Sequence, residues 1–220
     1  MKKILFPILC LFNCLLISAQ DSSEDILPKN DWVIRLNAGS ACVNVGGTGE
    51  SAWKYDMDQD GWGFQYGIDV MNYREYMGYG IIFRHYMHHL PNVTKSESAI
   101  NENVRILYVA PQFSCIDESG LLKGLLVNLD LGIGYAHYLS DGVVDGDQNF
   151  SLPCSGLGIN ANVGFEYRFC VHWGVKISAS AEFYHFKDMH KDKHITDSFD
   201  ERTKLNLFGL TPQLGLAYHF

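Results

Sequence analysis

Residues 157–169 read Leu-Gly-Ile-Asn-Ala-Asn-Val-Gly-Phe-Glu-Tyr-Arg-Phe. Every odd position, from Leu157 to Phe169, is apolar or aromatic, whereas every even position is glycine, asparagine or a charged residue. A repeat of two residues is typical of a β-strand whose two faces lie in different environments. We therefore predict a strand here and ask which of its faces meets water.

The same alternation occurs in seven other stretches of the chain. It is clear in 62–70, 125–135, 173–183 and 208–220, and weaker in 32–43, 77–86 and 104–115. The intervals between the predicted strands alternate in length: 46–61, 87–103, 139–153 and 187–203 are long and polar, whereas 72–76, 116–124 and 170–172 are short. This rhythm is typical of an up-and-down barrel with loops at the cell exterior and turns in the periplasm.

Three features indicate that the apolar face meets lipid and the polar face lines the barrel. The apolar face runs for about nine to eleven residues, the span of a tilted transmembrane strand. Aromatic residues gather at the strand ends, as expected at the two membrane interfaces. One predicted rim holds Trp32, Phe113, Phe169, Trp173, Tyr218 and Phe220, and the other holds Trp62, Phe64, Tyr135, Phe183 and Phe208. A soluble barrel with a wet polar surface is the alternative.

The third feature is the opposite face, which carries many glycines and charged residues of both signs. Such charges can pair across a narrow lumen while the glycines leave room for them. The residues predicted to form this polar network are Arg35, Asp69, Arg84, Asp130, Glu166, Arg168, Lys176 and Glu182.

The chain resembles the small outer-membrane β-barrel family of the OmpA/OmpX type and the broad porin-like outer-membrane barrel group. The resemblance rests on the final strand, which ends at Phe220 with Tyr218, Leu216, Leu214 and Pro212 at alternate positions, and on the stretch 108–113 (Tyr-Val-Ala-Pro-Gln-Phe). It covers nearly all of 31–220 and implies an all-β, eight-stranded antiparallel transmembrane barrel in the outer membrane. It also implies that the barrel assembly machinery recognises Tyr218 and Phe220, and it carries no shared catalytic site.

The N-terminus predicts secretion across the inner membrane. Lys2 and Lys3 precede an apolar run and an acceptable cleavage site at Ile17-Ser18-Ala19, which together are typical of a signal peptide at 1–19. The remaining 20–220 forms one predicted barrel domain. Removal of the peptide takes two lysines and no acid, so the formal charge falls from -8 to -10. An acidic chain of this kind is a poor ligand for nucleic acid.

The first long loop contains Asp56, Asp58 and Asp60, followed by Gly61. Alternate carboxylates before a glycine open a calcium loop, but the twelfth position of an EF-hand would fall on Gly67, inside a predicted strand. An EF-hand is therefore excluded. A charged loop tip is the favoured interpretation, and a short calcium turn is the alternative; we expect no other cofactor.

Histidines and cysteines cluster near the strand ends. A metal site in the external loops would use His85, His88, His89, His190 and His194, although scattered interfacial histidines are the favoured interpretation. Strand directions place Cys42 and Cys154 near the outer rim and Cys115 and Cys170 near the periplasmic rim. Pairing within each end and free thiols both remain open.

No arrangement of residues predicts an enzyme. Gly156-Leu-Gly158-Ile-Asn-Ala161 matches a dinucleotide fingerprint, but it lies inside a strand with no helix after it. The same-face neighbour of His137 is Leu139, and Ser140 would point to the other face. The sequence therefore offers no nucleophile beside a base.

These observations favour a non-enzymatic outer-membrane barrel whose lumen is filled by side chains and whose external loops contact surfaces, ligands or partners. A narrow channel for ions or small solutes, running past Gly132, Gly158 and Gly215, is the first alternative. A barrel subunit of an envelope secretion or assembly machine is the second.

Overall fold

The computed structural model describes residues 31–46, 62–95, 98–119, 121–144, 148–186 and 205–220. The predicted signal peptide lies outside the described residues. The strands are β1 (Trp32–Gly46), β2 (Trp62–Arg74), β3 (Met77–Lys95), β4 (Ser98–Glu118), β5 (Leu125–Val144), β6 (Gln148–Arg168), β7 (Trp173–Phe186) and β8 (Leu205–His219). No helix in the described part of the chain is long and apolar enough to span a membrane.

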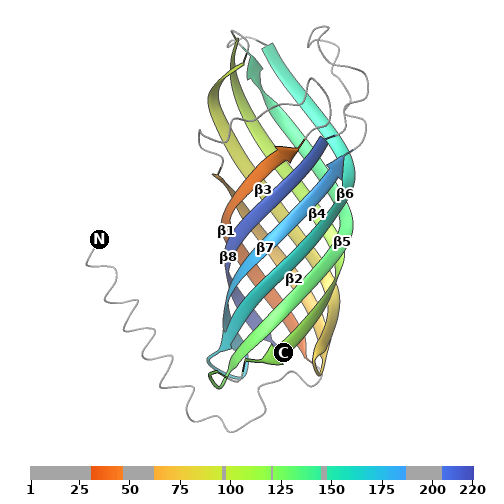
Figure 1. The fold of residues 1–220 in the computed structure, drawn as a ribbon, viewed down its shortest axis with the longest axis vertical. Coiled ribbons are helices and arrows are strands. Elements are labelled where there is room, and N and C mark those ends of the chain that lie inside the picture. Colours follow the sequence, from red (N-terminus) through yellow and green to blue (C-terminus); the bar gives the residue numbers. More distant parts are fainter. Residues whose placement is uncertain (1–30, 47–61, 96–97, 120, 145–147, 187–204) are drawn as a thin grey trace, which may run out of the picture.

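The eight strands form one closed antiparallel barrel in chain order, which confirms the predicted fold (Figure 1). Each strand pairs with its neighbours in the chain, and β1 closes the barrel against β8. Following paired residues once around the wall from Leu36 leads back to β1 at Gly46, ten positions further along. This stagger tilts the strands and decides which side chains meet across the lumen.

Two hairpins extend far beyond the rest of the barrel. β3 and β4 remain paired out to Lys95 and Ser98, and β5 and β6 remain paired out to Val144 and Gln148. The pairing of β2 with β3 ends at Met87, so β3 to β6 project past the ends of β1 and β8 (Figure 1). We call this the hairpin end of the barrel.

The prediction that 87–103 and 139–153 are loops was therefore wrong, because both segments are largely strand. Their polar residues were the reason for the error. Outward positions such as Asn101 and Asn103 are exposed, while Glu102 between them is buried. A strand that is polar on both faces has no apolar alternation to reveal it.

The opposite end carries only short connections and is called the turn end. Strands stop at Arg74, Glu118 and Arg168 and resume at Met77, Leu125 and Trp173, close to the predicted short turns. In the first turn Glu75 takes a positive φ of 56°, a left-handed conformation that reverses the chain within two residues.

Alternate residues of the strands face outward and inward, as predicted, and β2 and β7 show the contrast between the two faces. On β2 the even positions from Trp62 to Val70 are exposed, and the odd positions from Gln65 to Tyr73 are buried. On β7 the parity is reversed, with Ile177 60% exposed and Lys176 fully buried. The outer wall is thus apolar and the lumen holds the ionised side chains, which is the arrangement of a barrel surrounded by lipid.

Candidate functional site

Two carboxylates organise the charged side chains near the turn end of the lumen. Glu166 on β6 accepts a hydrogen bond from Arg35 Nε at 2.9 Å and bonds to His219 Nε2 at 2.6 Å. Asp130 on β5 accepts from Lys176 Nζ at 2.9 Å and from Ser114 Oγ at 2.5 Å. All these side chains are buried, so each charge is paired where water is scarce.

Tyr73 joins the two groups. Its hydroxyl lies 2.8 Å from Ser114 Oγ, and its ring lies 5.2 Å from the guanidinium carbon of Arg35. Contacts therefore run from Glu166 through Arg35 and Tyr73 to Asp130. Among the described residues, one connected network links β1, β2 and the strands from β4 to β8.

Two further carboxylates lie nearer the middle of the lumen. Asp69 pairs with Arg84 and accepts from Asn37 Nδ2 at 2.9 Å. Glu182 accepts from four neutral donors: Gln65 Nε2 at 2.7 Å, Tyr184 Oη at 2.7 Å, Asn160 Nδ2 at 3.2 Å and Ser180 Oγ at 3.1 Å. These four donors to Glu182 are thus amides or hydroxyls, whereas Asp69, Asp130 and Glu166 each also accept a hydrogen bond from a lysine or arginine.

Seven of the eight residues predicted for the lumen lie buried in these contacts. Arg168 differs, because it is only half-buried at the turn end and donates from Nη2 to the carbonyl of Val171 at 2.6 Å. Sequence reasoning gave no role to His219 or Tyr73. Their odd-numbered positions could have revealed them, because each shares the inward face of its strand with other buried polar residues.

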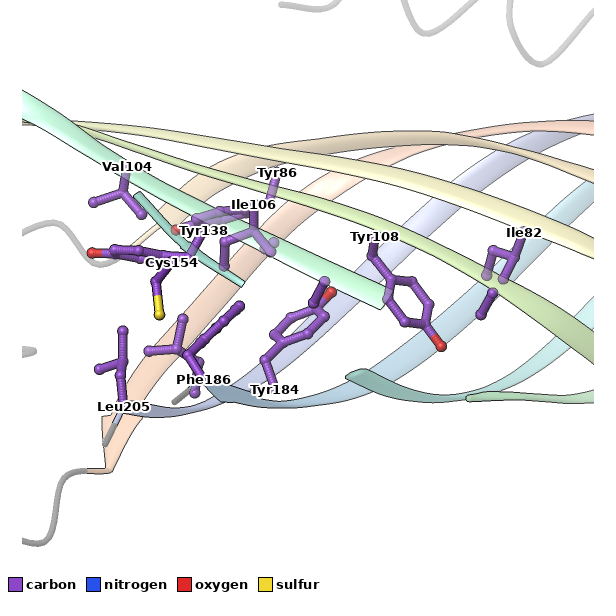
Figure 2. Packing of buried hydrophobic residues seen from close by; sticks show 14 residues of the cluster. Ile82, Tyr86, Val104, Ile106, Tyr108, Tyr138, Cys154, Tyr184, Phe186 and Leu205 are labelled. Carbon is purple, nitrogen blue, oxygen red and sulfur yellow. The ribbon is translucent and has the colours of Figure 1, made fainter. Parts of the chain in front are cut away.

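The hairpin end of the lumen is filled by apolar side chains, which the sequence did not predict. They form one cluster drawn from seven strands, with aromatic rings from β3, β4, β5 and β7 (Figure 2). Its members are Ala41, Ile82, Tyr86, Val104, Ile106, Tyr108, Ala110, Ala136, Tyr138, Cys154, Tyr184, Phe186, Leu205 and Leu207. A smaller apolar cluster lies at the turn end, comprising Val33, Met71, Tyr73, Ile116, Leu126 and Ala217. Apolar packing thus fills the lumen at both ends of the charged network.

Neighbouring residues occupy the space beside the three glycines that were predicted to leave a path through the barrel. A β-carbon at Gly158 would lie 2.7 Å from the Tyr108 ring, and one at Gly132 would lie 3.3 Å from the Tyr108 hydroxyl. At Gly215 the same space is taken by the amide of Asn37. These glycines make room for neighbouring side chains, which occupy the space beside each of them.

The histidines predicted to start the second external loop lie within β3 and do not converge. His85 Nδ1 lies 2.8 Å from the hydroxyl of Tyr66, and His89 Nδ1 lies 2.7 Å from Asn103 Oδ1, both on the outer face. His88 occupies the alternate, inward position, where its ring packs against Tyr86. Among the described residues, no group of three or more histidines, cysteines or acids could hold a metal ion.

Several predicted ligands fall outside the described residues. These are Asp56, Asp58 and Asp60 of the acidic loop, together with His190 and His194. The short calcium turn therefore stays a prediction. None of the four cysteines that the structure describes is in a disulfide: Cys154 is buried in the apolar cluster, Cys42 is half-buried, and Cys115 and Cys170 are exposed.

A hydroxyl does lie beside His137, although not the one considered from the sequence. Ser155 on β6 places its Oγ 3.1 Å from His137 Nδ1 and 2.7 Å from the hydroxyl of Tyr135. The barrel wall brings Ser155 opposite His137, and sequence proximity could not reveal this. Ser140 faces the lumen as expected and donates to Glu102 at 2.5 Å.

Comparison with solved structures places this architecture among outer-membrane barrels. The outer membrane protein OprG from Pseudomonas aeruginosa superposes with a TM-score of 0.61 at 12% identity, covering 90% of this chain and 99% of that one. A major outer membrane protein from Thermus thermophilus gives a TM-score of 0.50 at 13% identity, covering 87% of this chain and 99% of that one. Neisserial surface protein A also gives 0.50, at 9% identity and with 86% and 97% covered. No protein-family model and no curated protein matches the sequence.

The closed eight-stranded wall, its apolar exterior and its ionised lumen define a small outer-membrane β-barrel protein. Its fold matches that of the OmpA/OmpX-like outer-membrane barrels, and its apolar outer wall suits a surrounding of lipid. The turn end is accordingly the periplasmic end, and the hairpin end faces the cell exterior.

Proposed function

We propose that the protein is a non-enzymatic barrel that acts through its external hairpins. These hairpins would contact ligands, other surfaces or partner proteins outside the cell. The observation that carries this proposal is the filled lumen. Tyr108 occupies the space at Gly132 and Gly158, and apolar clusters occupy the lumen at both ends. Eight strands enclose an interior just wide enough for side chains to fill, so this packing supports a lumen that does not conduct solutes.

A bilayer recording tests the proposal directly. The mature chain is refolded in detergent, its folding is verified by heat-modifiable gel migration, and single-channel current is measured in a planar bilayer. We expect a folded barrel without discrete current steps. Tyr108→Ala is the informative variant, because it removes the ring beside both glycines, and current steps in this variant alone would show that the ring blocks the lumen. Steps in the unaltered barrel that change with Lys176→Gln would instead establish the channel alternative.

The external contact is tested by shortening one hairpin. Replacing residues 91–101 by a tight turn removes the tip of β3–β4 and keeps Glu102 and the paired strands below it. We expect this variant to fold and to lose binding to immobilised surface polysaccharide or to cells. A matched variant replaces residues 119–124 at the periplasmic end and should bind as the parent does. Unchanged binding after loss of the tip would contradict a role for this hairpin.

Within the described strands, the Ser155–His137 contact is a feature that favours an enzyme. A catalytic imidazole is normally oriented by a third group, usually a carboxylate. In the part of the chain that the structure describes, His137 hydrogen-bonds to Ser155 and no acidic side chain bonds to it. We therefore expect Ser155→Ala to leave the acyl composition of surrounding lipids unchanged when vesicles are analysed by mass spectrometry. Acyl release that disappears in this variant would show hydrolase activity.

Insertion by the barrel assembly machinery is part of the proposal. It is supported by the exposed aromatic edge of β8, where Tyr218 packs edge-to-face on Trp173 and on Phe220, with ring centroids 4.8 and 4.9 Å away. Deleting Phe220 should lower the amount of folded barrel in the outer membrane. Refolding in detergent should be affected far less, because no machinery takes part in that reaction.

A further inference from the structure

The first and last strands of the barrel meet at one seam, and both direct a side chain to the same carboxylate. Arg35 on β1 donates to Oε2 of Glu166, and His219 on β8 bonds to Oε1. Glu166 itself belongs to β6, which is separated from the seam by β7. One carboxylate therefore uses one oxygen for each strand of the seam.

The wall between these side chains is built from small residues. Gly174 on β7 pairs with Ala217 on β8, and Ala217 pairs with Arg35 on β1. A β-carbon at Gly174 would lie 3.2 Å from Oε1 of Glu166, which is tighter than an ordinary contact. Glycine at this position leaves the space through which Glu166 reaches past β7 to the seam.

The backbone at the end of β8 fixes His219 on both sides. The amide of Phe220 donates to the carbonyl of Trp32 at 3.0 Å, and the amide of His219 donates to the carbonyl of His172 at 2.7 Å. The ring of His172 in turn bonds through Nδ1 to the carbonyl of His219 at 2.8 Å. The imidazole of His219 is thereby held inward, toward Glu166.

We propose that Glu166 is a latch that keeps the β1–β8 seam closed. The other buried ion pair at this depth, Lys176–Asp130, connects β7 and β5, and its salt bridge includes no residue of β1 or β8. Closure removes the last exposed strand edges, and an open edge inside a bilayer has no hydrogen-bond partners. The seam joins the two ends of the chain, so the latch governs how readily the closed barrel opens there.

Hydrogen exchange measured by mass spectrometry on the refolded barrel tests the latch. The latch variant is Arg35→Met with Glu166→Gln, which removes one cation and one anion together. The matched control is Lys176→Met with Asp130→Asn, which removes the other pair and leaves the same net charge. The measured quantity is the exchange rate of 32–46 and 205–219 relative to that of 98–118, a segment remote from the seam.

We expect this ratio to rise by about tenfold in the latch variant and to stay near the parent value in the control, because local opening exposes only the elements that separate. Equal ratios in the two variants would show that the seam responds to the loss of any buried pair, and the latch would be rejected. A latch variant that fails to fold while its control folds already supports a special role for Glu166. His219→Gln then provides the local measurement, because it removes one bond to Glu166 and retains Arg35.

Gly174→Leu supplies a second, independent disturbance, because it leaves every charge in place and crowds Oε1 of Glu166. Its matched control is Gly209→Leu on β8, where a β-carbon meets its nearest neighbour at 3.5 Å. Faster exchange at the seam in the Gly174 variant relative to its control is the expected result. Exchange that is equal in the two glycine variants would argue against the latch.

Discussion

The membrane-embedded part of the barrel and its projecting hairpin end distribute polarity in opposite ways. Within the membrane, Ile133 and Ile177 lie exposed on the outside while Asp130 and Lys176 are buried inside. At the hairpin end, the outer face carries hydrogen-bonded polar pairs, and the lumen holds the apolar cluster around Phe186. The same strands run through both parts, so the change follows the surroundings of the wall and not the fold.

The difference shows how the same barrel wall is adapted to lipid in one part and to water in the other. Lipid offers nothing to a polar side chain, so the membrane part places its charges inside and pairs them. Water surrounds the projecting hairpins, so they can be held by an apolar interior, as in a soluble protein. The four projecting strands thereby share an apolar core with β1, β7 and β8.

Removing one cation from the lumen should produce the largest effect. Lys176→Met leaves Asp130 buried without its cation, and we expect a loss of about 3–5 kcal/mol in the free energy of unfolding. Chemical denaturation in lipid vesicles measures this loss. Restoring charge balance with Asp130→Asn in the same chain should recover part of it. If Lys176→Met is as stable as the parent, water reaches Asp130 and solvates its charge in place of the lysine.

Truncating an aromatic ring on each side of β7 sharpens the comparison. Phe186 is fully buried in the apolar cluster, whereas Phe183 is 44% exposed on the outer face. Phe186→Ala should cost about 3–5 kcal/mol through lost burial and the resulting cavity. Phe183→Ala should cost clearly less, because lipid chains can take the place of the ring. Equal losses in denaturant would show that the hairpin-end cluster is not a core of the soluble kind.

Placing a cation on the outer face of each part tests where the membrane ends. Ile133→Arg puts a charge on the lipid-facing wall and should cost about 2–4 kcal/mol. Asn103→Arg puts the same charge on the exposed face of the projecting β4 and should change stability very little. The two variants are compared by denaturation in the same vesicles. A large loss in the Asn103 variant would place that face in lipid.

The sequence predicted the barrel because lipid on one side and paired charges on the other impose a strict alternation. Where that contrast fades, the sequence signal weakened, as in 104–115, or the prediction failed, as in the projecting hairpins, and each has a physical reason. In 104–115, Ile106 and Tyr108 face the lumen while Leu107 and Val109 face outward, so both faces are apolar. In the projecting hairpins, Glu102 and Ser140 make the inner face partly polar as well. Neither stretch shows the clean period of two that marks the other strands.

The contacts of the lumen were less predictable than its composition. The alternation of polar and apolar residues placed Arg35 and Glu166 on the inside. Their ion pair, however, joins residues that are 131 positions apart in the chain. It depends on the ten-residue stagger of the closed barrel and on the room left by Gly174. The Ser155–His137 contact has the same origin, because the register of β5 and β6 creates it. Neither the stagger of the barrel nor the register between two strands can be read from the composition of a single strand.

The smallest effect should come from the ion pair on the outside of the hairpin end. Arg105 and Asp141 join β4 to β5 there, with side chains 46% and 33% exposed. Water and salt screen such a pair, so Arg105→Met should change the free energy of unfolding by at most about 1 kcal/mol. Raising the ionic strength should remove even this difference, whereas the loss in Lys176→Met should persist, because its partner is shielded from the solvent. If both variants lose stability equally at high salt, the two charge pairs share one environment, and the contrast between the inside and the outside of the wall is wrong.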